Sequence, residues 1–397
     1  MRVRSALAVL LSLALASFVW LITVHHVYSP GSSLEPDPSG VPPRAHELAQ
    51  RHLALWSDDQ LLAAELKRMR ASNAEWDFMG RSFLAWSFAN LALRQPAEAP
   101  RYLKAIDAII DETLKLEAER GMHHFLMPYS RRAPFVMQPE RSQFLDGEIA
   151  LMLAHRLLIA PREDYRSELI RRVEAMTARM EQSPVLSAES YPDECWTFCN
   201  TVALAAIRGS DAVTGSDHSE LARRWVEVAR EKLVEPETGL LIASYTVRGE
   251  HLDKAEGSSI WLSASMLQLV DEPFAREQYK LARKQLGRDL LGFGWAREWP
   301  TGAKEQVDVD SGPIVPLLEV SAGSSGLAFV GAASFGDSAW NRELHTTLNF
   351  AGFLTRDESG LRFAASNQVG DAVVLYALSL GPAFDAFRAR LRERSGV

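Results

Sequence analysis

Two cysteines, Cys195 and Cys199, lie four residues apart in the stretch SYPDECWTFCN, and the chain has no others. We expect a helix over 193–208, because Ser190 and Asp193 have the spacing of a capping box, or Asp193 is itself the N-cap. On such a helix the two thiols lie one turn apart on one face. The helix dipole lowers the pKa of a thiol near the N-terminus, which suits a nucleophile or proton donor. The alternative is inert packing, the commoner role of buried free cysteines.

Other uses of this pair of thiols are poorly supported. Two cysteines at i and i+4 of one helix have poor geometry for a disulfide. They also make a weak zinc set, because no histidines cluster nearby and the adjacent His123 and His124 diverge on any regular element. The sequence therefore favours neither a disulfide nor a metal site here.

Carboxylates are the second kind of candidate. Asp77 begins an otherwise apolar helix in the stretch WDFMGRSF, where it could simply cap the helix. In a pocket, its neighbours Trp76 and Phe78 would instead raise its pKa and suit it to acid/base catalysis. Asp146 and Glu148 precede another apolar run. Asp77 and Glu148 could thus form a carboxylate pair in which burial and like charge keep one member protonated.

A third candidate is the pair Asp308 and Asp310, two residues apart in VDVDSGP. A D-x-D pair can bind a cation, but the usual continuation of a calcium loop is missing. The alternative is a turn that caps a helix. We predict no metal here and keep both aspartates as substrate-binding candidates.

Residues 1–28 have the features of a membrane segment. Arg2 and Arg4 precede an uncharged apolar stretch over 6–24, which as a helix spans about 29 Å, close to the thickness of a bilayer core. No clear small-x-small cleavage site follows. We predict a single-pass signal anchor in the inner membrane, with the arginines inside and the body in the periplasm. The alternative is a cleaved signal peptide and a secreted body.

The rest of the chain divides into a linker and one large body. Residues 29–45 are rich in Pro, Gly and Ser, which is typical of a linker. Residues 46–397 form the predicted body. The chain has 43 Lys and Arg against 51 Asp and Glu, a net charge of −8. There is no basic excess to neutralise phosphates, so we expect no nucleic-acid partner. The oligomeric state stays open.

Helical periodicity dominates the body, with about a dozen candidate helices. We expect short hairpin strands only at 239–247 and 360–366. A long run of helices without a parallel-strand pattern predicts an all-α toroid rather than a βα fold. The candidate helices are 57–72, 76–93, 98–120, 143–158, 163–180, 193–208, 219–234, 258–269, 274–286, 312–318, 326–335, 339–353 and 370–391, the last broken near Gly381 and Pro382.

Several stretches together resemble the linalool dehydratase/isomerase family, from about Trp76 to the C-terminus. CWTFCNTVALAAI resembles the family's segment with a catalytic cysteine. VEPETGLLIASYTV resembles its D/E-P-E-x-G segment followed by Ser-Tyr, and VDVDSGP its D-x-D-x-G turn. SSIWLSASMLQLVDEPFAREQY and GDAVVLYAL resemble the later helices. The resemblance implies an exported (α/α)6 barrel, a toroid of six helical hairpins, that holds no cofactor or metal. It also implies acid/base hydration, dehydration or isomerisation of monoterpene alcohols in an aromatic and apolar pocket.

The resemblance assigns a partial catalytic set. Asp77 corresponds to the family's aspartate and Cys199 to its second cysteine. Ser190 stands at the position of the first cysteine and Glu148 at that of the histidine. Cys195 has no counterpart and is predicted to be packing. We take Asp77, Glu148 and Cys199 as the predicted catalytic residues.

The family's tyrosine falls on Phe83 or Leu84, so another hydroxyl must serve as the donor. Tyr191 or Tyr245 could take that role. The predicted substrate-binding residues are Ser190, Tyr191, Asp193, Tyr245, Asp308 and Asp310.

Three hypotheses about function follow. The first is a membrane-anchored, extracytoplasmic, cofactor-free lyase or isomerase that acts on a small apolar alcohol or alkene. The second is a glycoside hydrolase on the same toroid, because paired carboxylates are the usual machinery of glycosidases. The third is a non-catalytic envelope protein. An apolar pocket that joins the candidate residues would favour the first, and a polar one the second.

Overall fold

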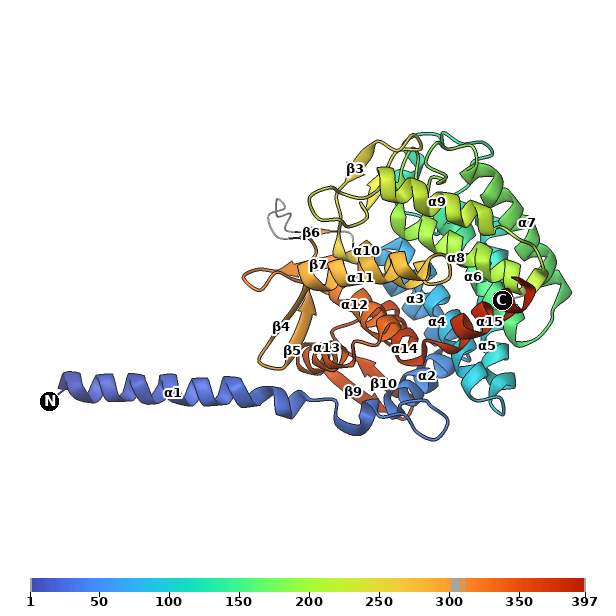
Figure 1. The fold of residues 1–397 in the computed structure, drawn as a ribbon. Coiled ribbons are helices and arrows are strands. Elements are labelled where there is room, and N and C mark those ends of the chain that lie inside the picture. The colour runs from blue at the N-terminus through green and yellow to red at the C-terminus, as the bar shows by residue number, and fades with distance from the viewer. Residues whose placement is uncertain (1, 301–307, 310, 396–397) are drawn as a thin grey trace.

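The computed structural model describes residues 2–300, 308–309 and 311–395. Fifteen α-helices lie within these ranges (Figure 1). Their bounds are α1 Arg2–Tyr28, α2 Pro43–Leu55, α3 Asp59–Ser72, α4 Ala74–Arg94, α5 Ala99–Arg120, α6 Gln143–Ile159, α7 Glu163–Met180, α8 Thr197–Thr214, α9 Ser219–Lys232, α10 Gly257–Leu267, α11 Glu272–Gln285, α12 Ala322–Phe335, α13 Ser338–Ala351, α14 Gln368–Ser379 and α15 Pro382–Ser395.

In the described part of the chain, short antiparallel strands form four small sheets between the helices, in the orders β1-β2-β3, β4-β5, β6-β7-β8 and β10-β9. The strands are β1 Cys195–Trp196, β2 Ser244–Tyr245, β3 His251–Asp253, β4 Gly287–Leu290, β5 Phe293–Ala296, β6 Asp308–Val309, β7 Gly312–Val315, β8 Val320–Ser321, β9 Leu354–Asp357 and β10 Gly360–Phe363.

The body is an (α/α)6 barrel, which confirms the predicted fold class. Helices α4, α6, α8, α10, α12 and α14 pack side by side, each on the next, and α14 returns to α4 to close the ring. Helices α5, α7, α9, α11 and α13 each follow an inner helix and pack outside it, and α2 covers α14. Helix α15 contacts α4, α6 and α8 across one end of the ring.

The sequence of each helix explains its place in the two rings. Inner helices are apolar on all sides, because they pack against both neighbours, the outer ring and the ring centre; nearly every residue of α4 between Phe78 and Ala92 is buried. Outer helices are amphipathic: α5 buries Tyr102, Ile106 and Ile109, while most of its charged residues lie on the other face.

Close packing between α6 and α8 depends on Gly147. A Cβ at this position would lie 3.1 Å from the backbone of Ala203, closer than side chains normally approach backbone atoms. The glycine therefore lets the two helices approach at the level of the residues that follow it on α6, including Glu148.

Two expectations about local structure were wrong, and the predicted linker differs in part. Asp193 adopts a left-handed conformation with φ of 57°, so the predicted helix at 193–208 begins only at Thr197, after β1. Residues 312–318 form β7 and a turn, because Pro313 and Pro316 cannot donate the hydrogen bonds of a helix. The predicted linker is partly structured, since α2 begins at Pro43 and Val41 is fully buried.

Helix α1 extends away from the body (Figure 1). By length and composition its segment Ser5–Tyr28 can cross a membrane; the mean hydropathy reaches 2.5 and most of its side chains are exposed. Within the described residues no other single helix passes this test, although α14 and α15 together do so as a pair bent by 53°. Such an N-terminal helix is compatible with an anchor or with a signal sequence.

Candidate functional site

A cavity of about 560 Å³ lies at the end of the barrel where the six inner helices begin. Its lining includes first-turn or second-turn residues of every inner helix. Three of these helices are capped by side chains that accept backbone N–H bonds, namely Asn73, Ser321 and Asn367. Because helix N-termini carry partial positive charge, six of them together favour anionic groups at this end of the barrel.

Most of one side of the cavity is apolar and aromatic. The side chains come from the first two turns of the inner helices, where each helix continues into the core. The main members are Trp76, Met79, Phe144, Phe198, Leu327 and Val369. This wall excludes water from any group that faces it and offers surface to an apolar ligand.

Glu75 and Tyr191 bring a carboxylate and a phenol together at this wall. The Tyr191 hydroxyl donates to the Glu75 carboxylate and accepts from the Met127 N–H at 2.9 Å. Tyr129 stacks on the Tyr191 ring with centroids 4.5 Å apart. Burial, followed by the negative charge of Glu75, raises the pKa of Tyr191, so the phenol keeps its proton.

Cys199 lies beside this pair and lines the same cavity. Burial raises the pKa of its thiol well above the usual value, and the charges of Glu75 and Glu148 raise it further. The neighbouring Ser190 hydroxyl lowers this pKa, but its oxygen has no well-aligned hydrogen-bond partner among the described residues. Cys199 is therefore a neutral thiol, and the lowering expected from the helix dipole is outweighed by burial.

Glu148 lies behind the cavity wall. One of its oxygens accepts from the Ser82 hydroxyl, and the other has no hydrogen-bond partner within the described ranges. Burial, reinforced by the charge of Glu75, raises its pKa from 4.5 to about 8, although the Ser82 hydrogen bond lowers it. Glu148 is thus largely protonated at neutral pH. Glu75, Tyr191 and Cys199 line the same cavity, whereas Glu148 lies outside its lining.

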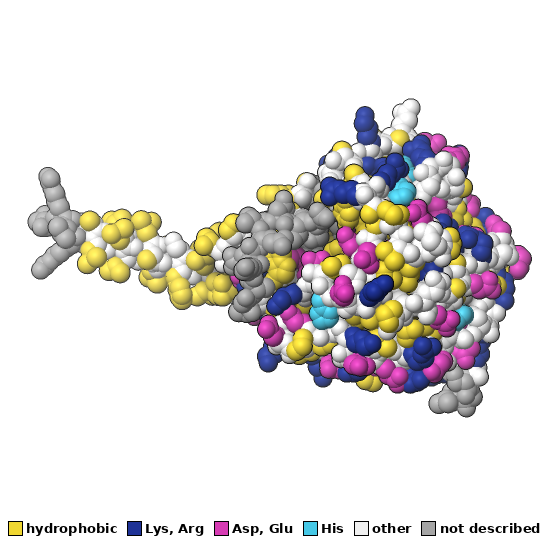
Figure 2. Space-filling model, turned by 90° about the horizontal axis from the view of Figure 1, so that it is seen from above, with side chains coloured by type: hydrophobic (Ala, Val, Ile, Leu, Met, Phe, Trp, Pro, Cys, Tyr) yellow, Lys and Arg dark blue, Asp and Glu magenta, His cyan; other side chains and the backbone are white. Residues whose placement is uncertain are grey.

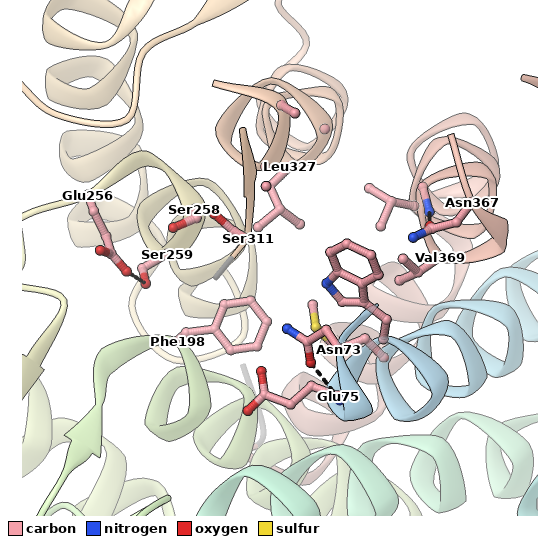
Figure 3. A pocket seen from close by; sticks show the side chains of 18 of the residues that line it. Asn73, Glu75, Phe198, Glu256, Ser258, Ser259, Ser311, Leu327, Asn367 and Val369 are labelled. Carbon is pink, nitrogen blue, oxygen red and sulfur yellow. Dashed lines mark hydrogen bonds between the residues drawn. The ribbon is translucent and has the colours of Figure 1, made fainter. Parts of the chain in front are cut away.

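The opposite end of the cavity is polar. Glu256, Ser258 and Ser259 of this end are labelled in Figure 3, and the Ser259 hydroxyl donates to Glu256 at 2.9 Å. Burial and then the charge of Glu298 raise the pKa of Glu256 to about 8. In Figure 3 the Phe198 ring lies between Glu75 and the Glu256–Ser259 pair. The cavity therefore has two acidic ends separated by an aromatic side chain.

Asp77 occupies a different environment from the one predicted. Its carboxylate accepts from Arg81 at 2.7 Å and from Arg70 at 3.2 Å, and it is not part of the cavity lining. Asp77 and Arg81 are four residues apart on α4, so they form an ion pair on one face of the helix. The carboxylate that faces the cavity is Glu75, two residues earlier.

Two other predicted residues serve the framework around the site. Asp193 accepts from the Val247 N–H at 3.1 Å and fixes the turn before β1. Tyr245 is fully buried and its hydroxyl pairs with Ser187 at 2.8 Å, outside the cavity lining. Cys195, also fully buried, is opposite Tyr245 in the β1–β2 pair. Both cysteines are free thiols.

The D-x-D pair contributes little to the described site. Asp310 lies outside the described residues, and the backbone of Asp308 pairs with Pro313 in the β6–β7 hairpin. The next residues, Ser311 and Gly312, do line the cavity. Within the described ranges, no group of three or more His, Cys, Asp and Glu side chains could hold a metal ion.

Sequence reasoning missed Glu75 and Glu256. The signal for Glu75 was the i,i+4 spacing of Asp77 and Arg81, which assigns Asp77 to an ion pair and leaves Glu75 on another face of α4. For Glu256 the signal was its position directly before the apolar helix α10, where it is the N-cap residue. Both belong to helix starts, which is where the cavity lies.

Comparison with known proteins agrees with this architecture. A sequence model of the linalool dehydratase/isomerase family matches residues 146–368, more than half of the chain. The chain belongs to the linalool dehydratase/isomerase family. The matched region includes Glu148 and Cys199 and begins after Glu75. Comparison with curated protein sequences gives no significant match.

Solved structures with the same fold are distant in sequence. The unsaturated glucuronyl hydrolase of Bacillus sp. GL1 is 11% identical, with a TM-score of 0.52 over 89% of this chain and 96% of that chain. A GH76 α-mannanase of Bacteroides thetaiotaomicron is 13% identical, with a TM-score of 0.49 over 80% of this chain and 86% of that chain. At such identities the glucuronyl hydrolase likeness supports the α/α-toroid fold alone.

Proposed function

We propose that the protein is a membrane-anchored, cofactor-free lyase or isomerase that adds or removes water, or moves a double bond, in a small apolar alcohol or alkene. One observation carries the proposal: Glu75, Tyr191 and Cys199 line one cavity that has an apolar wall, and the Tyr191 hydroxyl donates to Glu75. The protonated Glu148 is buried outside the lining, and on ionisation its charge would act on the Cys199 thiol. Membership of the family supports the same reaction class.

The size and the wall of the cavity fit such a substrate. Its volume of about 560 Å³ lies within the range of small-molecule sites, roughly 300–1,000 Å³. The hydrocarbon part would lie against Trp76, Met79 and Phe198, and its hydroxyl would face Cys199 and Tyr191. Aromatic faces also stabilise positive charge that develops on carbon when water leaves.

Each group has a role in the dehydration step. The neutral thiol of Cys199 donates its proton to the substrate hydroxyl, the C–O bond breaks, and water leaves. The protonated carboxyl of Glu148 replaces the proton of the thiol. The Glu75 carboxylate, held by the Tyr191 hydroxyl, removes a proton from the neighbouring carbon, and the C–H electron pair becomes the new double bond. A proton then returns from Glu75 to Glu148, and the reverse sequence is hydration.

The proposed cellular location is based on α1. Arg2 and Arg4 precede the apolar segment, and positive charge is retained on the cytoplasmic side of a membrane. We propose that α1 stays attached as a single-pass anchor and that the body lies in the periplasm.

Turnover by the purified full-length protein tests the proposal. The protein in lipid nanodiscs would be incubated with allylic and tertiary alcohols of increasing chain length and with the matching alkenes, and products would be measured by gas chromatography. We expect turnover of at least one apolar alcohol, reduced by about 100-fold or more in Cys199→Ala. No turnover of any alcohol or alkene, or full activity in Cys199→Ala, would contradict the proposal.

A second candidate is a carbohydrate hydrolase, favoured by the polar end of the cavity. Glu75 and Glu256 both line the cavity, and Asp253, Ser258 and Ser259 offer further hydrogen bonds to hydroxyl groups. In that case oligosaccharides would release reducing ends, Glu256→Gln would abolish the reaction, and Cys199→Ala would have little effect. The thiol variant therefore separates the two candidates.

A further inference from the structure

We infer that the body itself docks onto the lipid bilayer beside α1 through a surface that we call the apolar rim. This surface goes beyond the proposed function and rests on α1 remaining attached as an anchor. It comprises exposed apolar side chains on the β4–β5 turn, on the β7–β8 turn and at the end of α13, namely Leu290, Leu291, Leu317, Leu318, Phe350 and Phe353.

The exposure of these side chains is unusual for their positions. Leu317 is 99% exposed, Phe353 68% and Leu290 54%. Turns between strands normally carry Gly, Asn, Asp or Ser, which tolerate the backbone geometry and face water. Here Leu291 and Leu317 adopt left-handed conformations, with φ of 51° and 71°, although such conformations are strained for large side chains. Leucine at these turn tips therefore needs a partner outside the body.

The end of α13 connects the rim to the membrane helix. The Asn349 side chain donates to the Tyr28 carbonyl at 2.8 Å, at the last residue of α1. The Tyr28 ring meets Phe350 edge-on, with centroids 5.1 Å apart. Phe350 in turn meets Phe293 of β5 at 5.6 Å. An aromatic row thus runs from α1 across α13 to the first hairpin.

The β4–β5 turn touches α1 directly. Gly292, with φ of 82°, lies so close to the helix that a Cβ there would be 2.5 Å from the His25 ring. His25 belongs to the last two turns of α1. The leucines at this turn therefore lie near the level at which the apolar segment of α1 ends.

The second hairpin is fixed to the first. The Trp295 indole of β5 donates to the Leu318 carbonyl at 2.9 Å. Figure 1 shows β4, β5 and β7 on the side of the body from which α1 leaves, and Figure 2 shows hydrophobic side chains along α1. The exposed leucines and phenylalanines thus continue the hydrophobic surface of α1 onto the body.

A bilayer is the occupant that this arrangement favours. A contiguous exposed apolar surface marks an interaction site, and this one adjoins a helix whose own partner is lipid. The β7–β8 hairpin also carries Gly312 and Pro313, which line the cavity. A hairpin whose tip lies in the bilayer surface and whose base forms the cavity wall gives an apolar substrate a short path out of the membrane.

Depth-dependent fluorescence quenching in the full-length protein tests the docking. Leu317→Cys and Leu290→Cys would each carry an environment-sensitive fluorophore, in vesicles of phosphatidylcholine and phosphatidylglycerol with nitroxide-labelled lipid. The native Cys195 and Cys199 are buried, so labelling of the unsubstituted protein gives the background. The matched control is Leu61→Cys on α3, where the leucine is 59% exposed and α3 packs on α2 and α4.

We expect the two rim probes to be quenched by about twofold or more and the Leu61 probe to be unaffected. Rim probes as unquenched as Leu61 would overturn the inference. A change in fluorophore emission that depends on the protein-to-lipid ratio and not on the nitroxide lipid would also overturn the inference. Such a result would show that the rim contacts a second copy of the chain. Quenching without turnover would contradict only the proposed function, and turnover without quenching only the docking.

Discussion

At the scale of single residues, the site depends on which face of α4 each acidic side chain occupies. Glu75 and Asp77 are two residues apart, so they point in different directions from one helix. Glu75 reaches the cavity and bonds to Tyr191, whereas Asp77 is held by Arg81 and Arg70. The two carboxylates should therefore differ in what their removal changes: catalysis for Glu75, stability for Asp77.

Replacing Asp77 by Asn should destabilise the fold. The substitution leaves Arg81, which is 1% exposed, without its closest carboxylate, and breaking a buried pair costs about 3–5 kcal/mol. Denaturant unfolding of the full-length protein in detergent measures the change. The matched control is Glu220→Gln, whose partner Arg223 is exposed and whose loss should change the free energy of unfolding far less. Equal effects of the two substitutions would contradict the role of Asp77 as a structural ion pair.

Glu148 should make the protein less stable as the pH rises. Its pKa is about 8 in the fold against 4.5 ordinarily, so between these values the folded state holds a proton that the unfolded state has lost. The free energy of unfolding therefore falls with increasing pH across this window, by about 1.4 kcal/mol per unit at most. Below pH 4.5 both states are protonated, so Glu148 no longer makes the free energy of unfolding depend on pH and its destabilising effect is absent.

Comparison with Glu148→Gln isolates this contribution. The stability of the wild type minus that of Glu148→Gln, measured from pH 4 to pH 9, should decrease as the pH rises. Glu358→Gln, at an exposed turn, is the control and should leave a flat difference. A flat difference for Glu148→Gln as well would show that the carboxyl is not held protonated.

At the scale of elements, the site is built by the starts of the six inner helices. Their alternation with amphipathic outer helices could be predicted from hydrophobic periodicity, as could the break between α14 and α15 at Gly381 and Pro382. The start of α8 could not, because the left-handed Asp193 is stabilised by contacts from distant segments, including Val247. The β4–β5 hairpin was not expected either, because leucines stand beside Gly292 in its turn and the flanking strands are only four residues long.

Gly147 should be required for the contact between α6 and α8. In Gly147→Ala the new Cβ lies 3.1 Å from the Ala203 backbone, which cannot move without shifting α8, and overpacking of this kind costs about 1–3 kcal/mol. The control is Gly326→Ala on α12, where an added Cβ meets nothing within 4 Å and should stabilise the helix by about 0.5–1 kcal/mol. Thermal unfolding measures both; a neutral Gly147→Ala would contradict the close approach.

At the scale of the whole molecule, a membrane helix, an apolar rim and an apolar cavity occur in one chain. The all-α toroid and the apolar N-terminal helix were predictable, because both depend on patterns that extend over many residues; the six-hairpin form was implied by the family resemblance. The contacts of single side chains could not be predicted. Glu75 and Asp77 are only two positions apart on α4, yet Glu75 lines the cavity and Asp77 forms an ion pair with Arg81. The sequence match assigns the barrel to the linalool dehydratase/isomerase family. The lining of the cavity is the basis of the proposed reaction.

Glu75 is the proposed acid/base group of a cofactor-free reaction in this cavity. The most direct measurement is turnover of an apolar allylic alcohol in D₂O by the wild type, Glu75→Gln and Tyr191→Phe, with mass analysis of the alkene and of recovered alcohol. We predict deuterium exchange and product formation in the wild type, a loss of about 100-fold or more in Glu75→Gln, and a smaller loss in Tyr191→Phe. Unchanged turnover in correctly folded Glu75→Gln would contradict this role of Glu75.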